Sequence, residues 1–216
     1  MADTVPPRLV LASGSSIRQS MLKGARLSFS VQTADIDERA LEEKLSSLSP
    51  DALAADSLAK ELAIAKAQAV SGIVSQANPG VFVIGADQVL EHEGNLLHKA
   101  ANREEADDKL KRLQASTHHL IAAAALVRDG QTLWSTSDRA SLTMRALSEA
   151  DRSAYLDRAG DAATQSVGAY RLEELGAALF ERIEGDYFTI LGLPLLPLLS
   201  ALRTYGIDPL LETATT

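Results

Sequence analysis

The sequence predicts an α/β fold in which helices flank a mixed, twisted sheet. Segments with the pattern of buried strands alternate with segments of helical periodicity along most of the chain, which is the order typical of this class. Two long strand-like runs joined by Asp129-Gly130 add an antiparallel hairpin to that alternation. With 216 residues, of which 46% are hydrophobic, the chain is long enough to bury a sizeable core.

The elements of the first half follow a strand–helix order. Residues 8–12 have the pattern of a buried strand, and the small polar residues after them can cap a helix that runs to about Gly24. The next segments predict a short strand, a weak helix, a strong helix rich in Ala, Leu and Lys, and a second buried strand, at residues 29–33, 37–48, 57–75 and 81–85. The most loop-like stretch is 46–56.

The second half adds the hairpin and three helices. In chain order it predicts a hairpin turn, a helix, two long strands, a capped helix and a last helix, at residues 93–95, 102–114, 118–127 with 132–144, 148–158 and 194–205. Ser148 and Asp151 form the capping pair, whereas residues 160–168 look irregular. We therefore expect one domain over residues 1–216, with flexible tails at 1–7 and about 210–216.

The net charge limits the kind of partner. The 21 basic and 29 acidic residues give a net charge of −8, whereas affinity for the phosphate backbone of a nucleic acid comes from clustered Lys and Arg. We therefore expect no nucleic-acid polymer as a partner. One small anion can still bind in a local basic pocket.

Cysteine is absent, which excludes disulfides, thiolate zinc sites and thiol catalysis and fits a reducing compartment. Residues 1–8 lack the basic-then-apolar layout of a signal peptide. The longest apolar stretches, 120–127 and 190–199, are far shorter than a membrane span. We expect a cytoplasmic protein with no membrane partner.

The first strand ends in a small polar segment that can hold an anion. Ser13, Ser15 and Arg18 stand in the run A-S-G-S-S-I-R at residues 12–18. Small residues let backbone amides approach a ligand, hydroxyls donate hydrogen bonds, and an Arg one turn into a helix can fork onto a phosphate. The same residues are also compatible with a serine-capped helix and nothing more.

An acidic residue follows the second buried strand. Asp87, followed by Gln88, comes straight after the apolar run, so we expect it at the carboxyl edge of the sheet, where α/β proteins usually bind ligands. An Asp there can hold a hard cation or take a proton from water, or it can simply form a turn.

Further charged residues can complete a site. Asp35, Asp37 and Glu38 follow the short strand and can share a Mg²⁺, although such a run is often only a solvated loop. Lys66 and Lys99 are single lysines that are also compatible with plain surface positions. Together with Arg18, they would supply positive charge for a polyphosphate.

The histidines predict no metal centre. His118 and His119 are adjacent on a strand, so their side chains point to opposite faces and cannot chelate together. His92 and His98 flank a hairpin, where we expect them to be exposed.

These motifs, taken in order, resemble the Maf family of nucleoside triphosphate pyrophosphatases, also known as septum formation inhibitors. The similarity covers roughly residues 9–206. It rests on A-S-G-S-S-I-R, D-E, A-I-A-K-A, G-A-D, L-H-K-A, I-E-G-D-Y and L-G-L-P-L, at residues 12–18, 37–38, 63–67, 85–87, 97–100, 183–187 and 191–195. Ser16 and Ala100 stand where the family motifs have proline.

The resemblance implies a Maf/Ham1 (ITPase-like) fold with two lobes around a cleft, a divalent cation (Mg²⁺, alternatively Mn²⁺), and hydrolysis of a nucleoside triphosphate to the monophosphate and pyrophosphate. Such an enzyme would clear modified or non-canonical nucleotides, and the family also suggests a homodimer. By match with the motifs, the implied catalytic residues are Asp87, Glu38 and Lys66, the metal ligands are Asp87 and Glu38, and the substrate-binding residues are Ser13, Ser15, Arg18, Lys66, Lys99, Gln88 and Glu173.

Two positions resemble the 7-methyl-GTP branch of the family. Gln88 follows the catalytic Asp and Glu173 lies late in the chain, as in that branch. A carboxylate can accept both donor groups of a guanine edge, which uracil and thymine lack. Ile17 departs from the Trp of that branch, and residues 161–168 replace the usual E-P-x-D-K-A-G segment.

Two alternative functions stay open at this point. One is a pyrophosphatase of the dTTP/UTP type in the same family. The other is a nucleotide-binding regulator of cell division without turnover, which the altered segment at 161–168 suggests because the family lysine is missing there.

Overall fold

The computed structural model describes residues 9–48 and 54–211. Within them, the strands are β1 Leu9–Leu11, β2 Ser30–Val31, β3 Phe82–His92, β4 Asn95–Leu97, β5 Thr117–Arg128, β6 Gln131–Met144 and β7 Phe180–Glu184. The helices are α1 Ser16–Gly24, α2 Glu38–Leu48, α3 Ala55–Ala77, α4 Arg103–Leu113, α5 Glu149–Ala159, α6 Ala162–Gln165, α7 Tyr187–Ile190 and α8 Leu195–Thr204, with a 3₁₀ turn at Leu175–Leu179. The predicted α/β class is confirmed.

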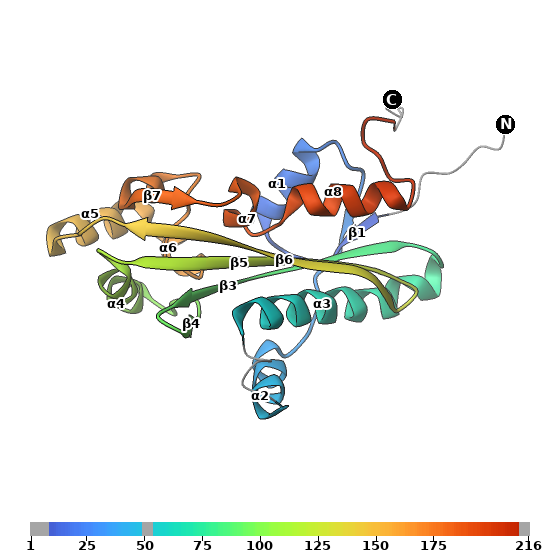
Figure 1. The fold of residues 1–216 in the computed structure, drawn as a ribbon, viewed down its shortest axis with the longest axis horizontal. Helices are drawn as coiled ribbons and strands as arrows, with labels where there is room; N and C mark the ends of the chain where they lie inside the picture. The colour runs from blue at the N-terminus through green and yellow to red at the C-terminus, as the bar shows by residue number, and fades with distance from the viewer. Residues whose placement is uncertain (1–8, 49–53, 212–216) are drawn as a thin grey trace.

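The described strands form one mixed sheet in the order β2-β1-β3-β5-β6-β7, with β4 added beside β3. β1 is parallel to β2 and β3, and the remaining pairs are antiparallel. The long helix α3 covers one face of the sheet, while α1 and α8 cover the other (Figure 1). The predicted mixed sheet flanked by helices is therefore what the chain builds.

The described residues form four hydrophobic clusters, and the two largest lie toward opposite ends of the sheet, in two lobes. One core lies between the sheet, α4 and α5 and includes Leu110, Leu142 and Tyr155. The other includes Leu22 of α1 and Leu198 of α8. The strands β3, β5 and β6 contribute side chains to both cores, so the lobes share continuous strands (Figure 1).

Most predicted elements are confirmed, with boundaries that differ by a few residues. The Asp129-Gly130 turn joins β5 to β6, and the Ser148 and Asp151 capping box begins α5. The helix expected at 57–75 begins two residues earlier and ends two residues later, as α3. The loop expected at 46–56 is wrong where the structure describes helix, at 46–48 in α2 and 55–56 in α3, and its residues 49–53 lie outside the described residues. The predicted tails fall mostly on 1–8 and 212–216, which also lie outside them.

Some predictions are wrong at the ends of strands and in irregular segments. The strand expected at 81–85 continues to His92 because the antiparallel partner β5 pairs with it as far as Glu91. The strand expected at 29–33 shrinks to the two residues of β2, and the segment 160–168 contains the one-turn helix α6. The short edge strand β7 was not predicted, because its residues F-E-R-I-E are largely exposed.

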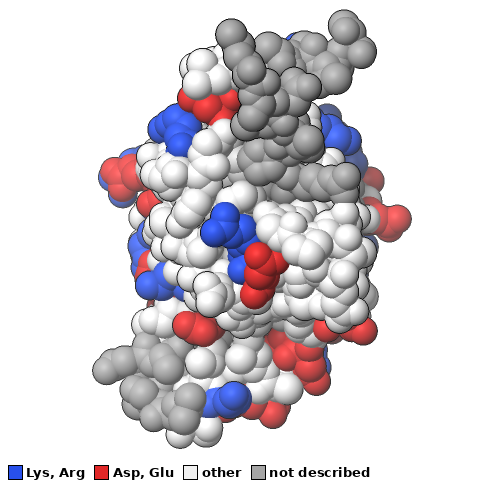
Figure 2. All heavy atoms as spheres, turned by 90° about the vertical axis from the view of Figure 1, so that its right-hand side faces the viewer, with Lys and Arg blue, Asp and Glu red and all other residues white. Residues whose placement is uncertain are grey.

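The surface agrees with a mixed charge distribution. Among the described residues that Figure 2 leaves in view, acidic and basic side chains are interspersed. Within the described residues, no helix combines the length and apolar character that a membrane span needs.

A buried polar cluster lies inside the α4–α5 lobe. His118 is fully buried, and its Nε2 lies 2.6 Å from the hydroxyl of Tyr170. His92 is also buried, with Nε2 2.9 Å from Ser116 Oγ, so the expectation that it is exposed is wrong. The reason is that β3 runs past the predicted strand end into this core. Neither Nδ1 atom has a hydrogen-bond partner in the described structure.

Burial lowers the pKa of His118 to about 3, and the neighbouring His92 and His119 act in the same direction. The neutral ring is therefore favoured in the folded state, whereas the unfolded chain takes up a proton near the ordinary pKa of about 6.5. The neutral ring therefore contributes its full stability when the pH is above the ordinary pKa of about 6.5. That contribution is lost as the pH falls from there toward 3.

We expect His118→Gln to reduce this acid sensitivity, because the amide does not titrate. Between pH 7 and pH 5, the wild type should lose about 2 kcal/mol more of its unfolding free energy than the variant. Urea denaturation at both pH values measures the difference. His119→Gln, on the opposite face of the same strand, is the matched control and should keep the wild-type loss. An unchanged pH dependence in His118→Gln would contradict the prediction.

Candidate active site

A gap in the hydrogen bonding of β3 provides the floor of the candidate site. On one edge of β3, pairing with β1 ends at Ile84, whose carbonyl accepts from Ala12 N, and pairing with β4 begins at Leu90. The other edge stays paired with β5 throughout. Asp87 and Gln88 lie in this gap and point to opposite faces of the sheet. The prediction that Asp87 follows the end of its strand is therefore wrong, although it does lie beyond the end of the parallel strand β1.

Asp87, Lys66 and Glu38 form a charged triad on the α3 face. Lys66 Nζ lies 2.5 Å from Asp87 Oδ1 and 2.6 Å from Glu38 Oε1. Burial raises the pKa of Asp87, against the opposing effect of the positive charges on Lys66 and Arg18. Asp87 is 6% exposed, whereas the Glu38 side chain is half exposed at the start of α2. One ammonium thus holds two carboxylates from distant parts of the chain.

Close packing of α3 on β3 places Lys66 beside Asp87. A Cβ added to Gly85 would lie 1.9 Å from the Ala63 carbonyl oxygen and 2.8 Å from the Ala67 methyl group. The facing residues of α3 and β5 are also small, including Ala59 and Ala123. Because a glycine and alanines face each other at this point, the backbone of α3 lies close to that of β3. Lys66, between Ala63 and Ala67 on this helix, therefore lies beside Asp87.

Arg18 occupies the opposite side of the same gap. Its Nη1 donates to Ala86 O at 3.0 Å and to Ser13 Oγ at 3.1 Å, and its Nε donates to Gly192 O at 2.7 Å. Ala86 O is available because β1 has already ended. Burial lowers the pKa of Arg18, while Asp87 and Glu38 raise it, and a guanidinium remains protonated in proteins. Ser15 caps α1 by accepting from Arg18 N at 3.4 Å.

All of the site residues implied by the sequence line one cleft. Its volume is about 880 Å³, and its walls include Ser13, Ser15, Arg18, Glu38, Lys66, Asp87, Gln88, Lys99 and Glu173. Lys99 and Glu173 are exposed residues of the rim. The cleft therefore gathers residues from nearly the whole length of the chain, with basic and acidic groups facing the same space.

The structure also brings residues to the cleft that the sequence analysis missed. Arg39 and Glu42 of α2 and Arg171 of the rim line it, and Arg171 donates to Glu174 Oε1 at 3.0 Å. Arg39 directly follows the D-E motif, which was the only sequence signal for it. Of the three carboxylates expected to share a cation, only Glu38 lines the cleft; Asp37 instead accepts from Ala40 N at 2.9 Å in the first turn of α2.

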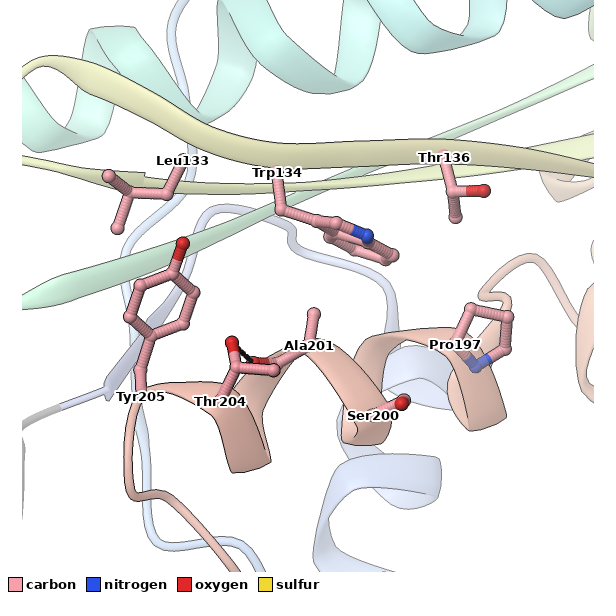
Figure 3. Close-up of a pocket in the computed structure, with 8 residues that line it drawn as sticks. All are labelled: Leu133, Trp134, Thr136, Pro197, Ser200, Ala201, Thr204 and Tyr205. Atoms are coloured by element: carbon pink, nitrogen blue, oxygen red, sulfur yellow. Dashed lines mark hydrogen bonds between the residues drawn. The ribbon is translucent and has the colours of Figure 1, made fainter.

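A second cavity lies between β6 and α8 on the other face of the sheet. It measures about 370 Å³, and Figure 3 shows Trp134 of β6 facing Ala201 and Pro197 of α8 across it. The remaining lining residues are Leu133, Thr136, Ser200, Thr204 and Tyr205. None of these carries a charge, so this cavity has nothing to neutralise a phosphorylated ligand. The charged cleft is therefore the candidate site for a phosphorylated ligand.

The fold and this cleft define an α/β protein that can hold a multiply charged anion between basic side chains and a pair of carboxylates. Comparison with known families identifies the family: a family model described as "Maf-like protein" matches residues 8–205. The chain therefore belongs to the Maf family.

Two named relatives agree with this assignment. A protein of Nitrobacter winogradskyi named nucleoside triphosphate pyrophosphatase is 50% identical over 91% of this chain and 93% of its own length. A protein of Brucella abortus biovar 1 named 7-methyl-GTP pyrophosphatase is 46% identical over 91% of this chain and 95% of its own. Among solved structures, the Staphylococcus aureus Ham1 protein covers 63% of this chain and 71% of its own, at 15% identity and a TM-score of 0.36.

We expect Gly85→Ala to damage both stability and the triad. The added methyl group overlaps the Ala63 carbonyl, so α3 must move away from β3, at a cost of about 3 kcal/mol or more. The same movement withdraws Lys66 from Asp87, so nucleotide affinity, measured by calorimetry, should fall as well.

Gly72→Ala on the same helix is the matched control. A Cβ at Gly72 meets nothing within 4 Å, and alanine is favoured over glycine inside a helix, so this variant should gain about 0.5–1 kcal/mol. Thermal and urea denaturation of both variants measure the opposite signs. Equal stability of Gly85→Ala and the wild type would show that α3 does not depend on this contact.

Proposed function

We propose that this chain is a nucleoside triphosphate pyrophosphatase, which hydrolyses a nucleoside triphosphate to the monophosphate and pyrophosphate. The observation that carries the proposal is the convergence of Arg18, Lys66 and Lys99 with Asp87 and Glu38 in one cleft. The names of the Nitrobacter and Brucella relatives agree with it. We take the nucleoside triphosphate as substrate, whereas a homodimer and a cytoplasmic location stay predictions.

Charge neutralisation and proton transfer explain how these residues would act. Water attack on a triphosphate is slowed by charge repulsion, and Arg18, Lys66 and Lys99 would offset that charge. Asp87 would accept a proton from the water that attacks the α-phosphorus, while the bond to the β-phosphate breaks and pyrophosphate leaves. A carboxyl whose pKa burial has raised is a stronger base than an exposed one, which suits Asp87 to this role.

A divalent cation fits the two carboxylates. Asp87 and Glu38 already converge on a single positive group, the Lys66 ammonium, and oxygen ligands suit Mg²⁺ or Mn²⁺. Within the described residues, no three His, Asp or Glu side chains gather as a metal site. Mg²⁺ usually takes one or two carboxylates and completes its shell with waters and substrate phosphates. When bound here, such a cation would neutralise phosphate charge and orient the triphosphate.

A residue at the rim of the cleft suggests which nucleobase the substrate carries. Glu173 is an exposed carboxylate of the cleft wall, and a carboxylate can accept two N–H donors from a guanine edge. The positive charge of an N7-methylated guanine would strengthen that contact. We therefore propose a guanine nucleotide, with 7-methyl-GTP as the first candidate.

Asp87→Asn tests the reaction. With Mg²⁺ and a panel of nucleoside triphosphates, the wild type should release pyrophosphate, and the variant should lose roughly 10²–10⁴-fold in kcat, the usual contribution of a general base. Because the amide removes one charge of the buried pair with Lys66, thermal denaturation of the variant is measured alongside, so that a loss of activity in the folded variant can be assigned to the reaction. Asp108→Asn, at an exposed position on α4, is the control with unchanged activity. A wild type that binds nucleotides tightly without releasing pyrophosphate would instead support a regulator without turnover.

Glu173→Gln tests base recognition. The variant loses one acceptor from the guanine edge, so the ratio of kcat/KM for 7-methyl-GTP over UTP should fall by about tenfold or more, while activity with UTP persists. Glu181→Gln on β7 is the control and should keep the wild-type ratio. If both variants keep it, Glu173 does not contact the base.

A further inference from the structure

We propose that Lys109 of α4 is a positioning residue, whose ammonium group joins two segments of the cleft wall and thereby directs Lys99 toward the triphosphate. This inference rests on the proposed function, because Lys99 is taken there as a contact of the substrate phosphates. Lys109 lies in none of the motifs that the sequence shares with the Maf family.

Lys99 stands in a segment without regular secondary structure. Residues 98–102 connect β4, which ends at Leu97, to α4, which begins at Arg103, and they adopt neither helix nor strand. Lys99 is exposed at the rim of the cleft. A long side chain on such a segment keeps one direction only if other groups hold the backbone that carries it, because an unconstrained backbone has many conformations.

Two charged side chains of α4 hold this segment. Glu105 accepts from Ala101 N at 2.8 Å, and Lys109 Nζ donates to the carbonyl oxygen of His98. That carbonyl belongs to the same planar peptide unit as the nitrogen and Cα of Lys99. A hydrogen bond to the His98 oxygen therefore fixes the plane from which the Lys99 side chain starts.

The same ammonium also contacts a second segment of the cleft wall. Lys109 Nζ donates to Val167 O at 2.9 Å. Val167 and most residues from there to Glu174 line the cleft, and Glu173 is among them. Residues 161–168 contain no basic side chain, so α4 supplies the cation that contacts this segment. One group thus ties the segment of Lys99 to the segment of Glu173, and a movement of either carries the other with it.

The surroundings of Lys109 favour a lasting link. Its side chain is half-buried, and burial lowers its pKa to about 8, while Glu105, one helical turn earlier, acts against that shift. Near neutral pH the amine is therefore mostly protonated. A charged donor makes shorter and stronger hydrogen bonds than a neutral one, and partial burial protects them from competition with water.

The reacting groups of the cleft are held by other contacts. Asp87 and Lys66 meet because α3 packs closely on β3 at Gly85. Loss of the Lys109 bonds should therefore release Lys99 and leave the pair of Asp87 and Lys66 in place. A phosphate contact that is equally strong in the bound substrate and in the transition state changes KM and leaves kcat as it is.

Lys109→Met tests this role, because methionine keeps an unbranched side chain and removes the charge and the donors. We expect KM to rise by about tenfold for every nucleoside triphosphate of a panel, the usual cost of a lost charge-assisted hydrogen bond, while kcat stays within about threefold. Lys109→Arg keeps a charged donor and should recover most of the loss. Lys111→Met, at an exposed position two residues further along α4, is the matched control and should keep wild-type constants. A wild-type KM in Lys109→Met, or a fall in kcat alone, would overturn the proposal.

A double-mutant cycle with Lys99→Met separates positioning from a general effect on the fold. If Lys109 acts by directing Lys99, the double variant should have a KM no higher than that of Lys99→Met alone. If the two increases in KM multiply, Lys109 acts by another route and the proposal is wrong. A wild-type KM in Lys99→Met also overturns it, since Lys109 then has no phosphate contact to direct. If Lys109→Met does not fold, Lys109→Gln, whose amide is uncharged and one atom shorter, takes its place in the cycle.

The same variants can be compared without hydrolysis. Calorimetry with GTP and UTP analogues that carry a methylene group between the α- and β-phosphates gives the affinity of each variant. Should the wild type bind these analogues and release no pyrophosphate from any nucleotide, the proposed function fails, whereas non-additive losses of affinity in the Lys99 and Lys109 variants still support the positioning role. Additive losses, or none, overturn it. A wild type that neither hydrolyses nor binds overturns both proposals.

Discussion

The interruption of backbone pairing along one edge of β3 is the constraint on which the rest of the site depends. Between the last pairing with β1 at Ile84 and the first with β4 at Leu90, this edge of β3 has no partner among the described strands. An unpaired edge inside a protein needs other groups to satisfy it. Arg18 does so at Ala86 O, which brings a guanidinium to the same five residues that present Asp87 and Gln88. A structural requirement of the sheet thus recruits a basic side chain to the site.

Small residues next to the gap allow α3 to pack closely enough for its lysine to contact the carboxylates of the cleft. Gly85 lets the backbone of α3 lie against β3, and at this separation Lys66 contacts Asp87 and Glu38 together. The charges in turn limit one another: burial alone would favour a neutral Asp87, and the nearby ammonium and guanidinium oppose that effect. The packing of α3 and the electrostatics of the cleft are therefore two consequences of the same glycine.

Local patterns predicted the kinds of elements well, because periodicity, the Asp129-Gly130 turn and the Ser148 capping box act over a few residues. They did not predict how far β3 extends, since its later residues are held in the strand by pairing with β5 rather than by their own apolar pattern. The burial of His92 follows from this extension of β3. The strand β7 was not predicted because its residues are largely exposed and lack an apolar pattern. Local patterns marked Ser13, Arg18 and Asp87 as candidates, but the place of Glu173 in the same site came from resemblance to a family, because the sequence spacing between these residues carries no signal of proximity.

The two lobes have separate cores, yet β3, β5 and β6 pass through both without interruption. Within the described residues, these three hydrogen-bonded strands connect the two lobes directly. Enclosing a ligand by swinging one lobe over the other would require bending three hydrogen-bonded strands at once. Any adjustment to an incoming nucleotide must therefore come from the rim, through α2 and the segments that carry Lys99 and Glu173, over a rigid floor.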